Sequence, residues 1–221
     1  MQIDITRTVD TLLWAQMDLE KVMAANITVT KQQVETAIFV EVAEFINELD
    51  YKWWKPKAFL DPEKIRYELV DIMHFVLLHQ IITRPESVPE VNYEPDYSNP
   101  DNKFNKRCII PVFINYYDVV LDGYQSNSTI VIELAKNLIN EPSMQRFIYL
   151  AAQAGFDFPS MYTGYCIKNV VNQLRTYFGK KEFQSMHGSG ETFVANAPSV
   201  ILQGINLKRI PQVVAECIDY I

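Results

Sequence analysis

The chain has 221 residues, of which 48% are hydrophobic and 21% are charged, and this composition excludes wholesale disorder and fits a single domain. Its 20 basic and 27 acidic residues give a net charge of −7, which argues against nucleic acid or an anionic membrane as a partner. The 7 glycines are few for this length and favour a mainly helical protein. No run of about 18 apolar residues is present, so we predict no membrane span.

The cysteines Cys108, Cys166 and Cys217 are odd in number and show no C-x-x-C spacing. They predict neither a disulfide framework nor a structural zinc site, and a reducing compartment is the simplest interpretation. The N-terminus also lacks the basic region and apolar core of a secretory signal. We therefore expect a cytoplasmic protein, located in the host cytoplasm if its source is viral.

Apolar residues recur at three-to-four spacing through the first part of the chain, and this periodicity predicts helices. The predicted helices span 4–25, 30–48 and 62–83. Thr30 is placed to cap the second helix, and Asp61 followed by Pro62 is a favourable start for the third. The aromatic and basic segment 51–57 breaks the pattern, so we expect it to connect the second and third helices as a hairpin.

The second part of the chain begins with segment 84–110, which is rich in proline, asparagine and aspartate and is predicted to be a long irregular insertion. Helical periodicity then returns in three further runs. These runs span 111–140, interrupted near Asp122 and Gly123, then 142–154 and 157–178. From Gly179 onward we expect a loop with a short strand pair, followed by a closing helix near 210–220.

Two pairs of acidic residues stand on the predicted hairpin, Glu41 with Glu44 and Glu68 with Asp71. Residues three apart share one face of a helix, so each pair can direct two carboxylates at one point. Both pairs stand beside apolar stripes, where like charges are costly unless they are protonated or meet a cation. An antiparallel hairpin would bring the four carboxylates together.

Four carboxylates from two helices would form an oxygen-rich site suited to Mg²⁺, with Mn²⁺ as a substitute. Mg²⁺ usually binds through a few carboxylates and substrate phosphates, so we expect a phosphoester or phosphoanhydride substrate. The ion would lower the pKa of a bound water, from which one carboxylate could take a proton. The alternative is a set of solvated charges on an acidic chain. Glu48, one turn further on, is another ligand, a supporting acid or a solvated charge.

The connection between the two helices combines aromatic and basic side chains beside the proposed metal site. Trp53 and Trp54 could close over a base. The neighbouring lysines, one of which could meet phosphate, are Lys52, Lys55 and Lys57. The alternative is an indole that anchors the core of the hairpin, with the lysines in water.

A polar stripe is predicted on the helix 157–178. Its members are spaced three, four and three residues apart and share one helical face; they are Tyr165, Lys168, Asn172 and Arg175. The lysine and the arginine could clamp phosphates, and the asparagine offers both a donor and an acceptor to the edge of a base. The alternative is a solvated polar face.

Three polar residues at apolar positions have open roles. Gln16, between two leucines of the first helix, is equally consistent with a satisfied core glutamine and with a ligand contact. His74 and His79 are five residues apart and share no helical face, so they make a poor metal pair. We interpret both histidines as packing or supporting residues.

The stretch ETAIFVEVAEFINELDYKWWKPK, followed by KIRYELVDIMHFVLLH, resembles the dimeric all-α dUTPases, a branch of the all-α NTP pyrophosphatases. That family carries E-x-x-E and E-x-x-D pairs on two helices, K-W-W-K between them and D-x-x-H-F on the later helix. The segment KNVVNQLR resembles its K-N-x-L-N-x-x-R motif. The likeness covers 12–83 and 160–180, with Thr176 and Lys180 departing from the family pattern.

The resemblance implies one all-α domain over 1–221, a helical bundle with an irregular insertion and a C-terminal appendage. Its parts would be a metal-binding hairpin at 30–83, the insertion at 84–110, a phosphate- and base-binding helix at 157–179 and a tail at 180–221. Members of this family are homodimers whose sites can borrow groups from the partner subunit, so a homodimer is expected.

The resemblance further implies hydrolysis of dUTP to dUMP and pyrophosphate. The Mg²⁺ ligands would be Glu41, Glu44, Glu68 and Asp71, with Glu41, or else Glu44, as the base. The substrate-binding residues would be Gln16, Trp53, Trp54, Lys55, Tyr165, Lys168, Asn169, Asn172, Arg175 and Lys180. A viral dCTP pyrophosphatase group shares several of these motifs, so dCTP, alone or with dUTP, is an alternative substrate. A non-catalytic helical nucleotide-binding or regulatory protein is the alternative from another class.

Overall fold

The computed structural model of the protein describes residues 5–23, 28–49, 51–52, 54–55, 60–84, 128–187 and 214–215. The elements named in these ranges are helices throughout, which confirms the predicted all-α class. They are α1 (Ile5–Met23), α2 (Lys31–Glu48), α3 (Pro62–Thr83), α5 (Ser128–Asn140), α6 (Met144–Gln153), α7 (Phe158–Phe178) and α8 (Lys180–His187). Within these ranges, no helix combines the length and the apolar character needed to cross a membrane.

The helices predicted from periodicity agree with the structure to within a few residues. They are the runs at 4–25, 30–48, 62–83, 142–154 and 157–178. Of the predicted run 111–140, the part from Ser128 is helix α5, and the rest lies outside the described ranges. The insertion at 84–110, apart from Arg84, and the tail from residue 188, apart from 214–215, also lie outside them. The proposed division of the domain stays a prediction.

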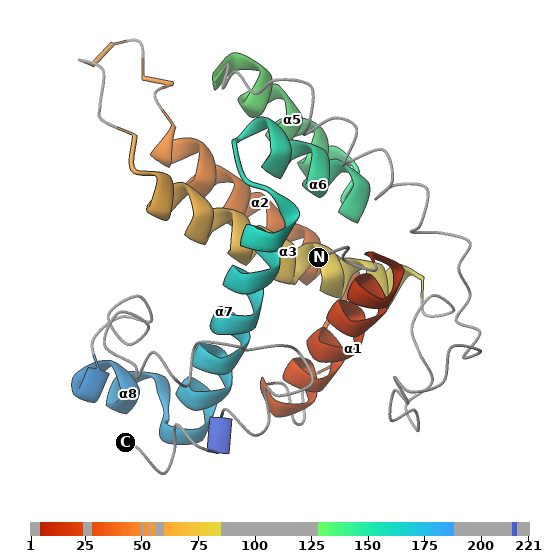
Figure 1. Ribbon diagram of the computed structural model, residues 1–221, viewed down its shortest axis with the longest axis vertical. Coiled ribbons are helices and arrows are strands. Elements are labelled where there is room, and N and C mark those ends of the chain that lie inside the picture. The colour runs from red at the N-terminus through yellow and green to blue at the C-terminus, as the bar shows by residue number, and fades with distance from the viewer. Residues whose placement is uncertain are drawn as a thin grey trace.

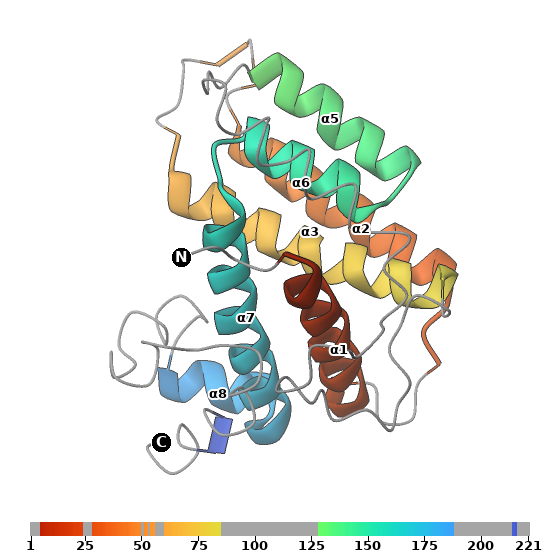
Figure 2. The same cartoon turned by 45° about the vertical axis from the view of Figure 1, so that its right-hand side comes forward.

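Helix α3 lies at the centre of the described bundle (Figures 1 and 2). It pairs with α2 to form the expected hairpin, and it also packs against α1, α6 and α7. Helices α5 and α6 cover one side of this hairpin, while α1 and α7 extend from the other. Because neighbours surround α3, most of its side chains between Leu69 and Gln80 are buried, on several faces of the helix.

Both helices of the hairpin begin at the residues that the sequence indicated. At the start of α2, the Gln33 N–H donates to Oγ1 of Thr30 at 3.3 Å, and the Thr30 N–H donates to Oε1 of Gln33 at 2.9 Å. At the start of α3, Asp61 accepts a hydrogen bond of 3.1 Å from the N–H of Glu63. Such caps satisfy donors that the first helical turn leaves open. They therefore fix where each helix begins and which way its carboxylates face.

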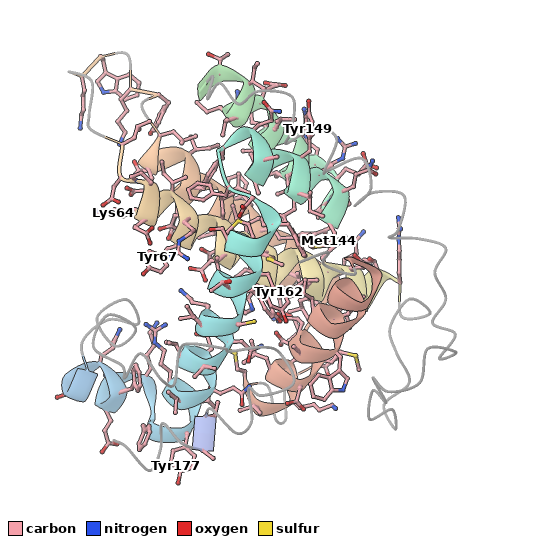
Figure 3. All side chains as sticks on the ribbon, in the orientation of Figure 1. Lys64, Tyr67, Met144, Tyr149, Tyr162 and Tyr177 are labelled. Carbon is pink, nitrogen blue, oxygen red and sulfur yellow. The ribbon has the colours of Figure 1, made fainter. Side chains whose placement is uncertain are left out.

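Helix α7 crosses α3 at a glycine. A β-carbon placed on Gly164 would lie 2.7 Å from Cγ2 of Val70, closer than real β-carbon contacts allow. The absence of a side chain at Gly164 thus lets the two helices approach at this point, where the α7 residue Tyr162 marks the crossing in Figure 3. One turn beyond the crossing, α7 carries Lys168.

The prediction of a loop directly after Gly179 is wrong for the first eight residues, because Lys180–His187 form helix α8. Gly179 has a φ of 83°, a backbone conformation that glycine adopts at low cost and that ends α7. The new helix is anchored by Phe183, which is fully buried, while its described neighbours are exposed. The segment has only two apolar residues, Phe183 and Met186, which are too few to establish a periodicity, so the sequence pattern gave no indication of a helix here.

Candidate functional site

Three carboxylates meet between α2 and α3. One ligand oxygen each from Glu41, Glu44 and Glu68 lies within 4.8 Å of the other two. Glu41 and Glu68 are half-buried and Glu44 is exposed, so the group stands at the edge of the core and remains open to solvent. The spacing of three on α2 and the pairing of the two helices thus bring these acids together, as the sequence predicted.

Burial and mutual repulsion leave the negative charge of this group poorly compensated. Loss of solvation, together with smaller contributions from repulsion by Asp71 and Glu44, raises the pKa of Glu41 from 4.5 to about 7. The pKa of Glu68 rises to about 7 for the same first reason, followed by repulsion from Asp71 and the other glutamates, Glu48 included. Carboxylates that resist ionisation in this way favour a cation that would neutralise them.

Asp71 is not among the three acids whose oxygens lie within 4.8 Å of one another, although its charge raises the pKa of both Glu41 and Glu68. Its Oδ2 lies 3.0 Å from Nζ of Lys168, which reaches it from α7. The two side chains are only 25% and 20% exposed, so the ion pair is mostly shielded from water. The same ammonium lowers the pKa of Glu41 and offsets part of its upward shift. The fourth predicted ligand is therefore held by a lysine at the border of the acid cluster.

The chemistry of the donors fits a hard divalent cation. All four acids offer oxygen, which Mg²⁺ and Mn²⁺ prefer, whereas zinc sites usually contain histidine or cysteine. The three clustered carboxylates carry more negative charge than the nearby lysine can balance. Members of the family suggested by the sequence generally use such an ion, and these residues are suited to hold one.

A network of polar side chains joins α1, α3 and α7. Oε1 of Gln16 accepts hydrogen bonds of 2.9 Å from Nδ1 of His74 and from the hydroxyl of Tyr165. An amide oxygen can only accept, so Nδ1 is the protonated nitrogen of His74. Burial lowers the pKa of His74 to about 3, with a smaller contribution from Lys168, and the ring is therefore neutral.

The network continues along α7. Nδ2 of Asn169 donates to the carbonyl oxygen of Ala15 at 3.3 Å, and Nε2 of Gln173 donates to Oδ1 of Asn169 at 2.8 Å. Nε2 of Gln16 donates to Oε1 of Glu20 at 2.8 Å. The first of these bonds ties α7 to α1, and the other two, each within one helix, provide partners for groups that would be costly to bury alone.

Three residues expected to contact the substrate, Gln16, Tyr165 and Asn169, belong to this network and are at most 1% exposed. Their polar atoms already bond to each other and to the backbone, and contact with a substrate stays a prediction for them. The sequence analysis missed two members, Gln173 and Glu20. The signal was present, because Gln173 follows Asn169 by four residues and Glu20 follows Gln16 by four, and such pairs share a helical face.

The rest of the polar stripe on α7 faces a more open environment. Lys168, Asn172 and Arg175 are each half-buried. Nε of Arg175 is buried and has no hydrogen-bond partner among the described residues. Lys180 is exposed at the start of α8. Lys168, Asn172 and Arg175 thus share a half-buried face, as predicted, and Lys168 reaches the acids.

The connection between α2 and α3 presents part of its predicted motif. Trp54 is 57% exposed, and its ring meets the edge of the Tyr51 ring at a centroid distance of 6.0 Å. Lys55 is exposed as well. Trp53 and Lys57 lie outside the described residues. The role of this exposed indole stays a prediction.

A family model described as dUTPase matches residues 8–179 of the chain. The match begins within α1 and ends after α7, so it includes the three clustered glutamates, Asp71 and the polar residues of α7. Helix α8 lies beyond it. No curated protein matches the chain.

Proposed function

This chain belongs to the dUTPase family, and from that premise we propose that it hydrolyses dUTP to dUMP and pyrophosphate with Mg²⁺, for which Mn²⁺ can substitute. Membership in the family brings hydrolysis of nucleoside triphosphates as its general activity. The observation that supports the fuller proposal is the group of Glu41, Glu44 and Glu68, whose oxygens lie within 4.8 Å of one another. Such a group is suited to a metal that also binds phosphate.

We assign the metal ligands to Glu41, Glu44, Glu68 and Asp71. When bound, Mg²⁺ would neutralise charge on the phosphates and lower the pKa of the attacking water. Among these acids, Glu41 is our choice for the group that takes the proton, with Glu44 as the alternative. Before any cation binds, the pKa of Glu41 is about 7, so this carboxylate retains affinity for a proton near neutral pH.

The half-buried face of α7 supplies groups for the rest of the substrate. Lys168 and Arg175 would hold the phosphates, since both are cationic and Lys168 already reaches the acid cluster. Asn172 would read the base, because its amide offers both a donor and an acceptor. The proposed substrate set is completed by Trp53, Trp54 and Lys55 of the connection between α2 and α3, and by Lys180.

The buried network has a supporting role in this proposal. Gln16, Tyr165 and Asn169 fix α1 and α7 against α3, which carries Glu68 and Asp71. Any nucleoside contact by these three side chains would require an exchange of the bonds that they now make. Their main contribution is to fix the position of Lys168 relative to Asp71.

We also propose a homodimer. Phe39 and Val40, adjacent on α2, are 56% and 43% exposed. Large apolar side chains exposed together are typical of a surface that another protein covers. Light scattering coupled to gel filtration would test this, and a monomer mass at micromolar concentration would contradict it.

A panel of deoxynucleoside triphosphates tests the proposed reaction. With Mg²⁺ present and pyrophosphate as the readout, we expect dUTP to be hydrolysed fastest. A higher rate with dCTP would favour the alternative substrate. Hydrolysis of none of them, with Mg²⁺ or Mn²⁺, would favour a non-catalytic nucleotide-binding protein. In that case a thermal shift with a non-hydrolysable dUTP analogue would still report binding.

A further inference from the structure

The ion pair between Lys168 and Asp71 joins a proposed phosphate-binding residue to a proposed metal ligand. Nζ of Lys168 lies 3.0 Å from Oδ2 of Asp71, and neither side chain is more than 25% exposed. The ammonium of Lys168 also lowers the pKa of Glu41, so it stands next to the cluster of carboxylates. This ion pair occupies Oδ2 of Asp71 and one N–H of Lys168, so it competes with both proposed roles.

The backbone around Lys168 is fixed, whereas its side chain is not. Four residues earlier, Gly164 lies against Val70 at the crossing of α7 and α3. Tyr165 and Asn169, on either side of Lys168 in the sequence, are anchored in the buried network. A lysine has a flexible four-carbon stem, so the ammonium can change partner while the helix stays in place.

Charge decides which partner the ammonium keeps. Without a metal, Lys168 is a positive charge among acids that repel one another, and pairing with Asp71 is favourable. A divalent cation bound by the same carboxylate brings twice the charge and repels the ammonium. The phosphates of a substrate then offer the lysine a new partner.

Resting on the function proposed above, we propose that Lys168 takes the place of the cation at Asp71 in the metal-free protein. Binding of the metal releases Lys168, which then binds the substrate phosphates. The metal and the triphosphate therefore bind in a coupled manner, with the metal first. In the metal-free state the triphosphate meets repelling acids and an occupied lysine.

Two binding measurements without turnover test this coupling. Calorimetry gives the affinity for Mn²⁺ without nucleotide, and then the affinity for a non-hydrolysable dUTP analogue with Mg²⁺. For Lys168→Met we expect Mn²⁺ to bind about tenfold tighter and the analogue about tenfold weaker. Lys168→Arg keeps the charge, and Lys181→Met removes an exposed lysine from α8. We expect both controls to bind Mn²⁺ within about twofold of the natural chain.

The opposite directions of the two changes distinguish this proposal from a merely structural role. A variant that misfolds would lose affinity for both ligands, and circular dichroism would reveal it. Unchanged or weaker Mn²⁺ binding by a folded Lys168→Met protein would overturn the coupling, even if the natural chain binds Mn²⁺ normally. If the natural chain itself binds neither Mn²⁺ nor Mg²⁺, the metal site fails and the coupling fails with it.

Discussion

Helix α3 carries two kinds of polar site, three residues apart. At Asp71 it faces a cluster of carboxylates whose charges repel one another, and at His74 it faces a network in which Nδ1 of the ring donates to Gln16. Burial lowers the pKa of His74 to about 3 and so keeps the ring neutral, whereas burial and repulsion from neighbouring acids together raise the pKa of Glu68 to about 7. Polar groups that find hydrogen-bond partners within the fold hold helices together. Like charges that the fold places side by side favour the binding of a cation.

Helix α7 connects the two sites. Tyr165 and Asn169 enter the network, and Lys168, between them in the sequence, enters the acid cluster. The same short stretch therefore contributes structure on one face and charge on the other. Variants on each side should separate the two roles.

The largest expected effect is on catalysis. Replacing Glu41 with glutamine removes a ligand and the proposed base, and we expect pyrophosphate release to fall by about 10²–10⁴-fold. The metal-free protein should stay folded, because the change also removes a repelling charge. Glu133→Gln on α5 is the matched control, since Glu133 is an exposed acid outside the cluster. Equal rates for the two variants would contradict the role of the cluster.

The next largest effect should be a loss of stability when the buried network is broken. Gln16→Leu would leave the donors of His74 and Tyr165 buried without an acceptor, and we expect the free energy of unfolding to fall by about 2–4 kcal/mol. Urea denaturation without ligand measures it. Gln145→Leu, at an exposed position on α6, should change the free energy by less than about 0.5 kcal/mol. Similar costs at both positions would show that the network is not a structural support.

A smaller effect is expected at the crossing of α3 and α7. Gly164→Ala forces a methyl group against Val70, and we expect a loss of about 1–3 kcal/mol in the free energy of unfolding. Val70→Ala in the same chain should recover part of that loss, because it removes the Cγ2 atom in conflict. A double-mutant cycle, measured by urea denaturation, gives the coupling energy between the two positions. Strictly additive costs would mean that the helices do not meet at these two residues.

The smallest effect concerns pH. Burial raises the pKa of Glu41 from 4.5 to about 7, so its protonation contributes stability that is full below pH 4.5 and is lost as pH rises through about 7. In the presence of a chelator, the free energy of unfolding of the natural chain should fall by about 1 kcal/mol relative to that of Glu41→Gln between pH 5 and pH 8, after allowance for partial exposure. Urea denaturation at the two pH values tests this. Parallel pH curves for the two proteins would contradict it.

Local rules explain why much of this site could be predicted from the sequence. The caps at Thr30 and Asp61 and the spacing of Glu41 and Glu44 involve residues within one helical turn. Those signals fix the helix starts and the face that carries the acids. The pairing of the two helices then followed from their short connection.

Partners distant in the sequence could not be predicted in the same way. Lys168 and Asp71 are 97 residues apart, and Tyr165 and Gln16 are 149 residues apart. No periodicity links such positions, because their contact depends on how α7 crosses α3 at Gly164. The same stripe on α7 therefore appeared uniform in sequence, although the fold divides it into a buried and a half-buried part.

The enclosure of α3 by four other helices limits what can be altered on it. Nearly every side chain along its middle contacts a neighbour, so a substitution there disturbs several interfaces together. A laboratory library that seeks a new nucleotide preference should leave this helix constant. The half-buried position Asn172 on α7, which we propose reads the base, is a better site for randomisation, because fewer interfaces depend on it.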